Sequence, residues 1–398
     1  MTTGARGSLG SDRERAVQRQ SGGVLKAVLV LAFVAAVAVW GVDGPASSLA
    51  AEGRSGEELK TAKIVAGDLS VDFLDNSNSP KILSGVDRLL NTKDAPGFDA
   101  FDPNDPGSSA GLNYEHIISG HSDPANWFAP RNGTYKLYRG PAANSVVLVR
   151  KAGDDPWALE SSMTYTVIAP CYIDFEFRCK ARDARRFGNR GYAVLFWADY
   201  MNDVEDVALH FRGVSGPGAA EQWIAADAPR THPDYTGGGT YRSLRAPALE
   251  YDSGHNLKLN MWSYEYPRFT RPFYYGRAAH GMTLMLMFDR TYRAEDEIRF
   301  SLFKFKVGPQ VRRPAWDFQY VIHRVETGKE YGYRGRLVWK KFVSPEDCLH
   351  EYETWAKRAP AAGPAPRPPG GTAGLPSNAS PRLPCALSET DQAAVLRR

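Results

Sequence analysis

Cysteine is scarce in this chain of 398 residues, in which only Cys171, Cys179, Cys348 and Cys385 occur. Their spacing matches neither a disulfide framework nor a set of metal ligands. If residues 171–179 form one strand, a rise of about 3.3 Å per residue places the first two sulfurs too far apart for a disulfide. We expect these two cysteines to share one face and pack as small apolar groups, and a pairing of either with Cys348 stays open.

Long runs of one charge are also missing. The 49 Lys and Arg residues are mixed with 45 Asp and Glu residues, which gives a formal net charge of +4. This distribution argues against a nucleic-acid-binding surface. The sequence has no Gly-x-Ser-x-Gly elbow, P-loop or dinucleotide-binding fingerprint, so a serine hydrolase or a nucleotide-dependent enzyme is not expected.

The N-terminal residues 1–50 contain the parts of an export signal. A polar stretch with several arginines precedes the apolar run 27–40, and small residues follow near Ala50. The run is shorter than the roughly 20 residues that a membrane span needs. We expect a signal peptide, with an uncleaved N-terminal anchor as the alternative. In both cases the protein would act outside the cytoplasm, periplasmic or secreted, and touch a membrane only through that segment.

The composition divides the remaining chain into three parts. Residues 51–63 are polar and are expected to form a linker, and residues 64–357 have the content of a folded domain. The stretch from Asp75 to about Ser109 is rich in Asp, Asn, Pro and Gly, which indicates long loops. Residues 358–398 are rich in Pro and Ala and are expected to be a disordered tail.

The hydrophobic pattern of the central part has mostly a period of two. Residues 171–179 alternate between apolar and polar side chains, as in a half-buried strand, and the apolar runs 192–197 and 282–288 indicate strands covered on both faces. Other strand-like segments are 64–74, 134–138, 146–150, 162–168, 206–212, 256–264, 298–307, 316–325 and 333–342. Only residues 344–355 look helical, with Ser344 as N-cap and Pro345 at the first position. The pattern predicts an all-β protein, a large antiparallel β-sandwich with one short C-terminal helix.

Two stretches resemble the galactose-mutarotase-like β-supersandwich. They are "LESSMTYTVIAPCYIDFEFRCKA", which follows Trp157, and "TGKEYGYRGRLVWKKF", from Thr327 to Phe342. The resemblance implies a concave face that binds sugar. The chain has "YAVLFWADYMND" where the family carries its catalytic histidine signature, so an epimerase acid is not carried over. Concanavalin-like and jelly-roll sandwiches are competing folds, because they also have aromatic-rich alternating strands.

Two carboxylates on one strand are the first candidate for chemistry. Asp174 and Glu176 occupy successive outward positions, where two acids are able to face one cleft and share acid and base roles. The simpler interpretation is a solvent-facing surface on which Arg178 neutralises them.

The segment from Trp197 to Arg212 is the leading candidate for ligand binding. It places Trp197, Asp199, Tyr200, His210 and Arg212 on two strands and the turn between them, so that aromatic and polar groups are able to meet at one rim. A hairpin whose polar residues only form the turn is the alternative.

A loop before the apolar run 282–288 supplies the other candidates. It contains Tyr274, Tyr275, Arg277 and His280, the last a possible acid or base, and Trp262 lies upstream as a stacking residue.

An Asp-rich segment is the only candidate for an ion. Asp99, Asp102 and Asp105 are able to offer oxygens to calcium, although the EF-hand pattern is absent. No other cofactor and no further metal site are expected.

Two functions remain open from the sequence. The first is an exported carbohydrate-binding or carbohydrate-active protein, whose partner is an oligo- or polysaccharide and which, if catalytic, is a hydrolase, lyase or epimerase. The second is a non-catalytic envelope protein that binds a protein partner or matrix through a sheet face.

Overall fold

The structure, a computed structural model, describes residues 56–76, 83–103, 110–120, 128–229, 237–253 and 263–358. All of them belong to one compact unit, Ser47–Arg398. Their named strands form three sheets, so the all-β prediction is confirmed. Among these residues no helix has both the length and the apolar character of a membrane span.

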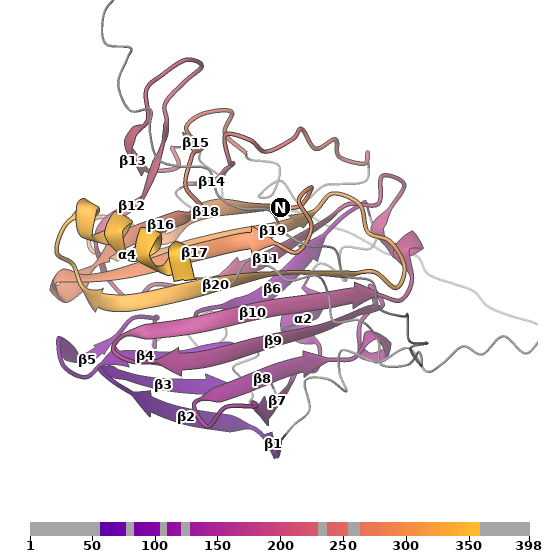
Figure 1. Cartoon of the computed structure of the whole chain (residues 1–398), viewed down its shortest axis with the longest axis horizontal. Helices are drawn as coiled ribbons and strands as arrows, with labels where there is room; N and C mark the ends of the chain where they lie inside the picture. The colour runs from indigo at the N-terminus through magenta and orange to yellow at the C-terminus, as the bar shows by residue number, and fades with distance from the viewer. Residues whose placement is uncertain are drawn as a thin grey trace, which may run out of the picture. The chain divides into compact units, whose positions relative to one another are not determined.

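The largest sheet has eleven strands and forms one layer of the molecule (Figure 1). Its order is β1 (Glu58–Leu59), β7 (Lys136–Arg139), β8 (Ser145–Arg150), β9 (Leu159–Ile168), β10 (Tyr172–Ala181), β20 (Glu330–Lys341), β17 (Met282–Thr291), β16 (Phe273–Ala278), β12 (Val204–Val214) and β13 (Gln222–Ala226), with β15 (Arg268–Phe269) paired to β12. Neighbouring strands in this order are antiparallel.

Two smaller sheets form the second layer. One has the order β14 (Gly238–Tyr241), β18 (Glu297–Val307), β19 (Arg312–Ile322), β11 (Ala193–Ala198) and β6 (Asn113–Ile118), and the other runs from β2 (Thr61–Ala66) through β3 (Leu69–Leu74) and β4 (Gly85–Asn91) to β5 (Ala95–Asp99). Trp197 of β11 packs 4.8 Å from Phe177 of β10, and Phe73 of β3 packs 5.3 Å from Tyr165 of β9 (ring centroids). Both small sheets therefore cover the same face of the large sheet, here called its inner face, and the predicted sandwich is confirmed.

Strand β10 shows why the sequence pattern was informative. Ile173, Phe175, Phe177 and Cys179 are buried, whereas the residues between them are only partly buried. The alternation directs the first set into the core and the second set to the opposite face, here called the outer face. The strands β11 and β17 follow the other prediction, because residues 193–198 and 282–288 are buried throughout.

The single long helix, α4 (Pro345–Arg358), lies on the outer face of the large sheet (Figure 1). The Ser344 hydroxyl accepts the Asp347 amide at 3.1 Å, as expected of an N-cap. The Tyr352 ring stacks on Phe273 of β16 with centroids 4.8 Å apart. The predicted C-terminal helix is confirmed, and it extends three residues further than expected.

The N-terminal part of the domain is more regular than the sequence indicated. The segment predicted as one strand over 64–74 is a hairpin of β2 and β3, which turns at Gly67 with φ of 58°. Strands β1 and β2 also extend into the predicted linker 51–63, and β4 and β5 lie within the predicted loop region. Polar and proline residues in these strands hid their character, because β5 holds a proline and a glycine.

The cysteines behave as expected within the described residues. Cys171, Cys179 and Cys348 are buried and unpaired. Burial is the main cause that raises the pKa of the Cys171 and Cys348 thiols to about 12. They therefore act as apolar packing groups, whereas Cys385 lies outside the described residues.

Candidate functional site

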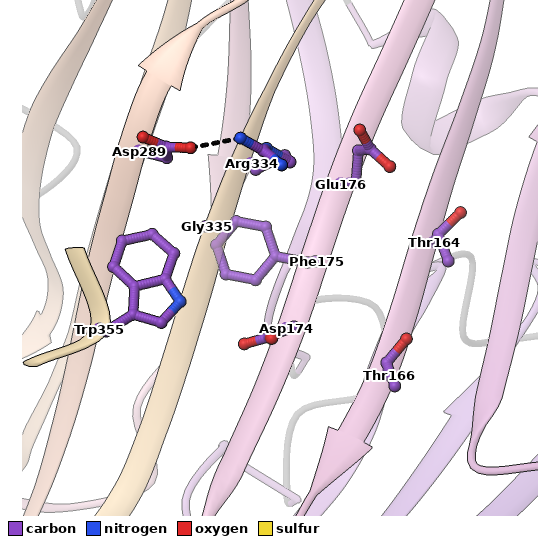
Figure 2. A pocket seen from close by; sticks show the side chains of 9 residues that line it. All are labelled: Thr164, Thr166, Asp174, Phe175, Glu176, Asp289, Arg334, Gly335 and Trp355. Atoms are coloured by element: carbon purple, nitrogen blue, oxygen red, sulfur yellow. Dashed lines mark hydrogen bonds and ion pairs between the residues drawn. The ribbon is translucent and has the colours of Figure 1, made fainter. Parts of the chain in front are cut away.

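A pocket of about 210 Å³ opens on the outer face where β9, β10, β20 and β17 are neighbours (Figure 2). It is called the outer-face pocket here, and its lining residues are Thr164, Thr166, Asp174, Phe175, Glu176, Asp289, Arg334, Gly335 and Trp355. Figure 2 shows Trp355 on one side, the two threonines on the other, and the two carboxylates of β10 between them. Six of the nine lining residues are thus polar or charged, and an indole ring closes one side.

The first row of the pocket is built around Asp174. This residue pairs with Thr166 of β9 and Arg336 of β20 in the sheet register. Arg336 donates from Nε to Oδ1 at 2.5 Å and from Nη2 to Oδ2 at 2.9 Å. The same guanidinium lies 4.5 Å from the ring centroid of Tyr172 and 5.9 Å from that of Trp355. A bidentate ion pair with Arg336, whose guanidinium lies against two aromatic rings, therefore holds this carboxylate in one orientation.

The second row is built around Glu176, which lies between Thr164 and Arg334 in the register. Arg334 does not pair with Glu176, because its Nη2 donates to Asp289 Oδ2 of β17 at 2.5 Å. This ion pair joins two lining residues on the neighbouring strands β20 and β17 and is drawn in Figure 2. Glu176 is therefore left without the guanidinium that the register places beside it.

A phenol takes the place of that cation. The Tyr292 hydroxyl donates a hydrogen bond to Glu176 Oε1. Burial, followed by the hydrogen bond and the negative charge of Glu176, raises the pKa of Tyr292 above its ordinary value. Within the described parts of the chain, no cation forms an ion pair with Glu176. Its second oxygen, Oε2, therefore accepts no hydrogen bond from the described residues.

The floor of the pocket depends on a glycine. Gly335 pairs with Phe175 across β20 and β10, and a Cβ at Gly335 would lie 2.4 Å from the Phe175 ring. The ring fills the space that a side chain on β20 would need. Because Phe175 is 2% exposed and points to the inner face, neither Phe175 nor Gly335 places a side chain on the outer face, and strands β10 and β20 themselves form the floor between the two polar rows.

This arrangement suits the recognition of hydroxyl groups. Asp174 and Asp289 are oriented by arginines, Glu176 is oriented by a phenol, and Thr164 and Thr166 are able to donate or accept. No group of three or more His, Cys, Asp or Glu side chains able to hold a metal ion occurs among the described residues. The pocket therefore offers hydrogen bonds and an apolar wall rather than a metal centre.

The structure brings together only one pair of the predicted catalytic residues. Asp174 and Glu176 line the same pocket, whereas no described histidine lines it. His210 on β12 contacts Asp206 at 2.8 Å through Nε2 and stacks on Tyr275 with centroids 4.9 Å apart. That contact lies across β12 and β16, which the strand order separates from β10 by β20 and β17.

The predicted ligand-binding residues Trp197, Asp199 and Tyr274 lie in the core. Trp197 is fully buried and its ring stacks on Phe318 at 5.3 Å. The Tyr274 hydroxyl donates to the carbonyl of Trp316 at 2.9 Å. The expectation that Trp197 and Tyr274 stack on a ligand is wrong, because β11 is covered on both faces and Tyr274 points to the inner face.

Asp199 is buried without a cation. Its Oδ1 accepts the Leu112 amide at 2.8 Å, and its Oδ2 has no hydrogen-bond partner among the described residues. Burial raises the pKa of this carboxyl to about 7. Asp199 is therefore a core residue, and its predicted contact with a surface ligand is not possible in this position.

The remaining members of the predicted rim are divided between two sheets. Tyr200 follows β11 and donates to Glu115 Oε1 at 2.5 Å, whereas Arg212 lies on β12 of the large sheet and pairs with Glu221 at 3.0 Å. The single rim expected from Trp197 to Arg212 is therefore wrong. The strands that flank the turn belong to different layers, a separation that local sequence cannot reveal.

The loop predicted before the apolar run 282–288 is strand β16. Tyr275 is buried on its outer face, and Arg277 pairs with Glu205 at 2.6 Å. His280 follows the strand with a left-handed φ of 61°, and its ring lies 4.7 Å from that of Phe98. Trp262 lies outside the described residues.

The proposed calcium ligands are used within the protein. Asp99 Oδ1 accepts the Leu89 amide at 3.0 Å, and Asp102 Oδ2 accepts Lys306 Nζ at 3.0 Å. Asp105 lies outside the described residues. The two described aspartates therefore stabilise the fold, and calcium binding there is not supported.

Besides Gly335 and Phe175, which was assigned to the core, sequence reasoning missed five residues of the pocket. These are Thr164, Thr166, Asp289, Arg334 and Trp355. The polar positions of the alternating stretch 162–168 could have indicated the two threonines. The others come from strands and a helix far along the chain, and only the strand order β9-β10-β20-β17 reveals that they meet.

Comparison with known proteins yields structural neighbours but no sequence relatives. No protein-family model matches the sequence, and no curated protein matches it. A putative aldose 1-epimerase of Escherichia coli K12 aligns with 71% of this chain and 99% of its own length, at 9% identity and a TM-score of 0.40. An aldose epimerase homologue of C. elegans aligns with 72% of this chain and 100% of its own, at 11% identity and a TM-score of 0.38.

A third neighbour is larger than the matched region. The heparan sulfate lyase HepC of Pedobacter heparinus aligns over 69% of this chain and 34% of its own, at 10% identity and a TM-score of 0.35. The structural neighbours of this chain thus include a putative aldose epimerase and an epimerase homologue, in agreement with the galactose-mutarotase-like resemblance of the sequence.

Proposed function

We propose that this chain is an exported carbohydrate-binding protein and that the outer-face pocket is its binding site. The observation that carries the proposal is the set of three carboxylates, each oriented by a partner, that line one open pocket with two threonines and a tryptophan. Sugars present many hydroxyl groups at fixed angles, and oriented acceptors recognise them with little loss of side-chain freedom.

The tryptophan supports the same function. Trp355 lines the pocket beside the polar rows, whereas the ring of Phe175 points to the inner face. The C–H faces of a sugar ring are apolar and pack well against aromatic rings, while its hydroxyls bond at the rim. A pocket with both kinds of surface fits a sugar better than a wholly apolar or an ionic ligand.

The charge of the lining narrows the class of sugar. Asp174, Glu176 and Asp289 line the pocket, and Arg334 is the one cation among the lining residues. A uronate or a sulfated sugar would meet like charge there, whereas a neutral sugar or an amino sugar would not. We therefore propose a neutral or amino-sugar glycan as the ligand.

Binding is favoured over catalysis by the state of the two carboxylates on β10. Acid and base catalysis at a sugar needs two groups free to exchange protons with the ligand. Asp174 accepts two hydrogen bonds from Arg336 and Asp289 accepts one from Arg334, so Glu176 is the one lining carboxylate that has no ion pair among the described residues. Among the described residues, no histidine lines the pocket to replace it.

Export is proposed from the sequence of residues 1–50. Expression of the full chain in a bacterium, followed by cell fractionation and N-terminal sequencing, tests it. A product in the periplasm or medium that begins near Ala51 agrees with export, and a cytoplasmic product that retains Met1 contradicts it.

A panel of oligosaccharides that differ in charge tests which class of sugar binds. Cello-oligosaccharides, glucosamine oligomers and oligogalacturonates supply neutral, cationic and anionic sugars of similar size. We expect the first or second to raise the melting temperature in a saturable way, because a ligand that binds only the folded state stabilises it. A shift that Glu176→Gln removes and Glu221→Gln keeps supports the proposal, since Glu221 pairs with Arg212 away from the pocket. No shift with any neutral or amino sugar contradicts it.

A further inference from the structure

A second pocket of about 210 Å³ lies next to the end of β17. It is called the end pocket here, and its lining residues are Ser243, Arg245, Ala246, Pro247, Phe269, Pro272, Asp289, Thr291, Ala294, Asp296, Glu297 and Ile298. Like the outer-face pocket, it combines carboxylates and hydroxyls with apolar surface. Nothing in the function proposed above uses it.

One short segment borders both pockets. Asp289 lines both the outer-face pocket and the end pocket. Two residues further along β17, Thr291 lines the end pocket, while the hydroxyl of the next residue, Tyr292, reaches Glu176 in the outer-face pocket. The register between β17 and β20 shifts between Phe288 and Thr291, so the strand changes course at this border. The two pockets are therefore neighbours that share a wall.

The end pocket contains a buried acceptor without a donor. Glu297 is 5% exposed, and its Oε1 accepts Arg299 Nε at 2.8 Å and lies 3.6 Å from Arg242 Nη2. Its Oε2 is buried and has no hydrogen-bond partner among the described residues. Buried acceptors are nearly always satisfied in folded proteins, so a bound hydroxyl group accounts for this oxygen well.

A second carboxylate of the end pocket parallels Glu176. Asp296 accepts the Tyr320 hydroxyl at 2.7 Å and the His323 amide at 3.3 Å, and the described residues offer it no ion pair. Each pocket thus has one carboxylate that is oriented by a phenol instead of a cation. Arg245 also lines the end pocket and is exposed, so this pocket carries both signs of charge. Repeated hydroxyl groups, rather than a single charge, match both pockets.

We infer that the two pockets are adjacent subsites of one groove and that the ligand is an oligosaccharide of at least two units. This inference rests on the proposed function, because it assumes that the outer-face pocket binds a sugar. One sugar unit lies in the outer-face pocket, the chain passes Asp289, and a following unit bonds to Glu297 Oε2 in the end pocket. A monosaccharide would use only half of this surface.

Chain length is the variable that tests the inference. The full chain is titrated by calorimetry with glucose, cellobiose, cellotriose and cellotetraose, and with the glucosamine oligomers of the same lengths. We expect the dissociation constant to fall by about tenfold or more between one and three sugar units. Each added unit that lies in a pocket makes further contacts with the protein, and the ligand does not lose its translational freedom a second time.

Two variants separate the subsites. Ala246→Phe adds a ring to the lining of the end pocket and removes none of its polar groups. Ala248→Phe adds the same ring two residues away, at an exposed position that does not line the pocket. The Ala246 variant should bind the longer sugars no better than the monosaccharide, while the Ala248 variant should keep the gain. Glu297→Gln provides a second test, because it leaves the side-chain shape and changes the buried acceptor. It should reduce the gain with length as well.

The outcomes separate the two proposals. A gain with length that Ala246→Phe removes supports the inference. Binding that does not depend on length, or a gain that Ala246→Phe leaves intact, overturns the inference while the proposed function stands. If no sugar of either series binds the wild type at any length, both proposals fail.

Discussion

The buried carboxyl of Asp199 makes the stability of this protein depend on pH in a defined direction. The side chain is fully buried, accepts the Leu112 amide and has no ion pair with any described residue. Burial raises its pKa from the ordinary 3.8 to about 7. The folded state therefore holds this proton up to about neutral pH, whereas the unfolded chain releases it near pH 4.

The sign and size of the effect follow from this difference. Between about pH 4 and pH 7 the folded state binds more protons at Asp199 than the unfolded state, so its contribution to the free energy of unfolding falls as the pH rises. A pKa that moves from 3.8 to about 7 corresponds to about 4 kcal/mol between these limits. Asp199→Asn keeps an acceptor for the Leu112 amide and removes the ionisation. We expect the variant to gain about 4 kcal/mol relative to wild type between pH 4 and pH 8.

Urea unfolding of wild type and variant at pH 4 and pH 8 measures this gain. Asp155 and Asp296 also have pKa values raised to about 6 mainly by burial, but they are present in both proteins and cancel in the difference. The pKa of Asp317 is raised mainly by burial and also by the charge of Asp199, so its contribution decreases in the variant and adds to the measured gain in the same direction. Asp227→Asn is the matched control, because that side chain is largely exposed. A difference between Asp199→Asn and wild type that is equal at both pH values would refute the argument.

Three further substitutions test the packing. Trp197→Ala should lower the free energy of unfolding by about 3–5 kcal/mol in urea, because it opens a cavity in the core, and a loss below about 1 kcal/mol would contradict its burial. Gly276→Ala should lower the free energy of unfolding by about 1–3 kcal/mol, because its Cβ would lie 2.4 Å from the Trp316 ring. Gly153→Ala is the control and should leave the urea midpoint unchanged, since a Cβ there meets nothing within 4 Å. Equal urea midpoints for the two variants would be inconsistent with the structure. Lys340→Met removes the cation that pairs with two carboxylates of α4 and should speed amide hydrogen exchange in that helix, and unchanged exchange would show that the ion pairs do not hold it.

Local patterns sufficed to predict much of the fold. The alternation in residues 171–179 and the apolar runs 192–197 and 282–288 each became strands of the expected type, because burial on one or both faces leaves a direct trace in the sequence. The helix was predicted from Ser344 as N-cap and Pro345 at the first position, and the structure has it. Strands β4 and β5 were missed because turn-forming and polar residues interrupt them, and their burial comes from contacts with the rest of the sandwich.

The candidate site was only partly accessible to the same reasoning. Asp174 and Glu176 could be placed on one face from their spacing alone, and they line one pocket. The predicted contacts of Trp197 and Tyr274 with a ligand were wrong, because both side chains are buried in the core. An aromatic side chain has the same sequence signature in both roles, and the strand order that separates them depends on contacts between distant segments.

The proposed function requires that Glu176 in the outer-face pocket accepts a hydrogen bond from a sugar. A calorimetric titration of the full chain and its Glu176→Gln variant with the glucosamine trisaccharide and with cellotriose tests it most directly. We expect wild type and Glu221→Gln to bind at least one of the two sugars equally well, and Glu176→Gln to bind it about tenfold to a hundredfold more weakly, as the loss of a hydrogen bond to a charged acceptor implies. Equal affinity of wild type and Glu176→Gln for both sugars, or no binding by wild type, would contradict the claim.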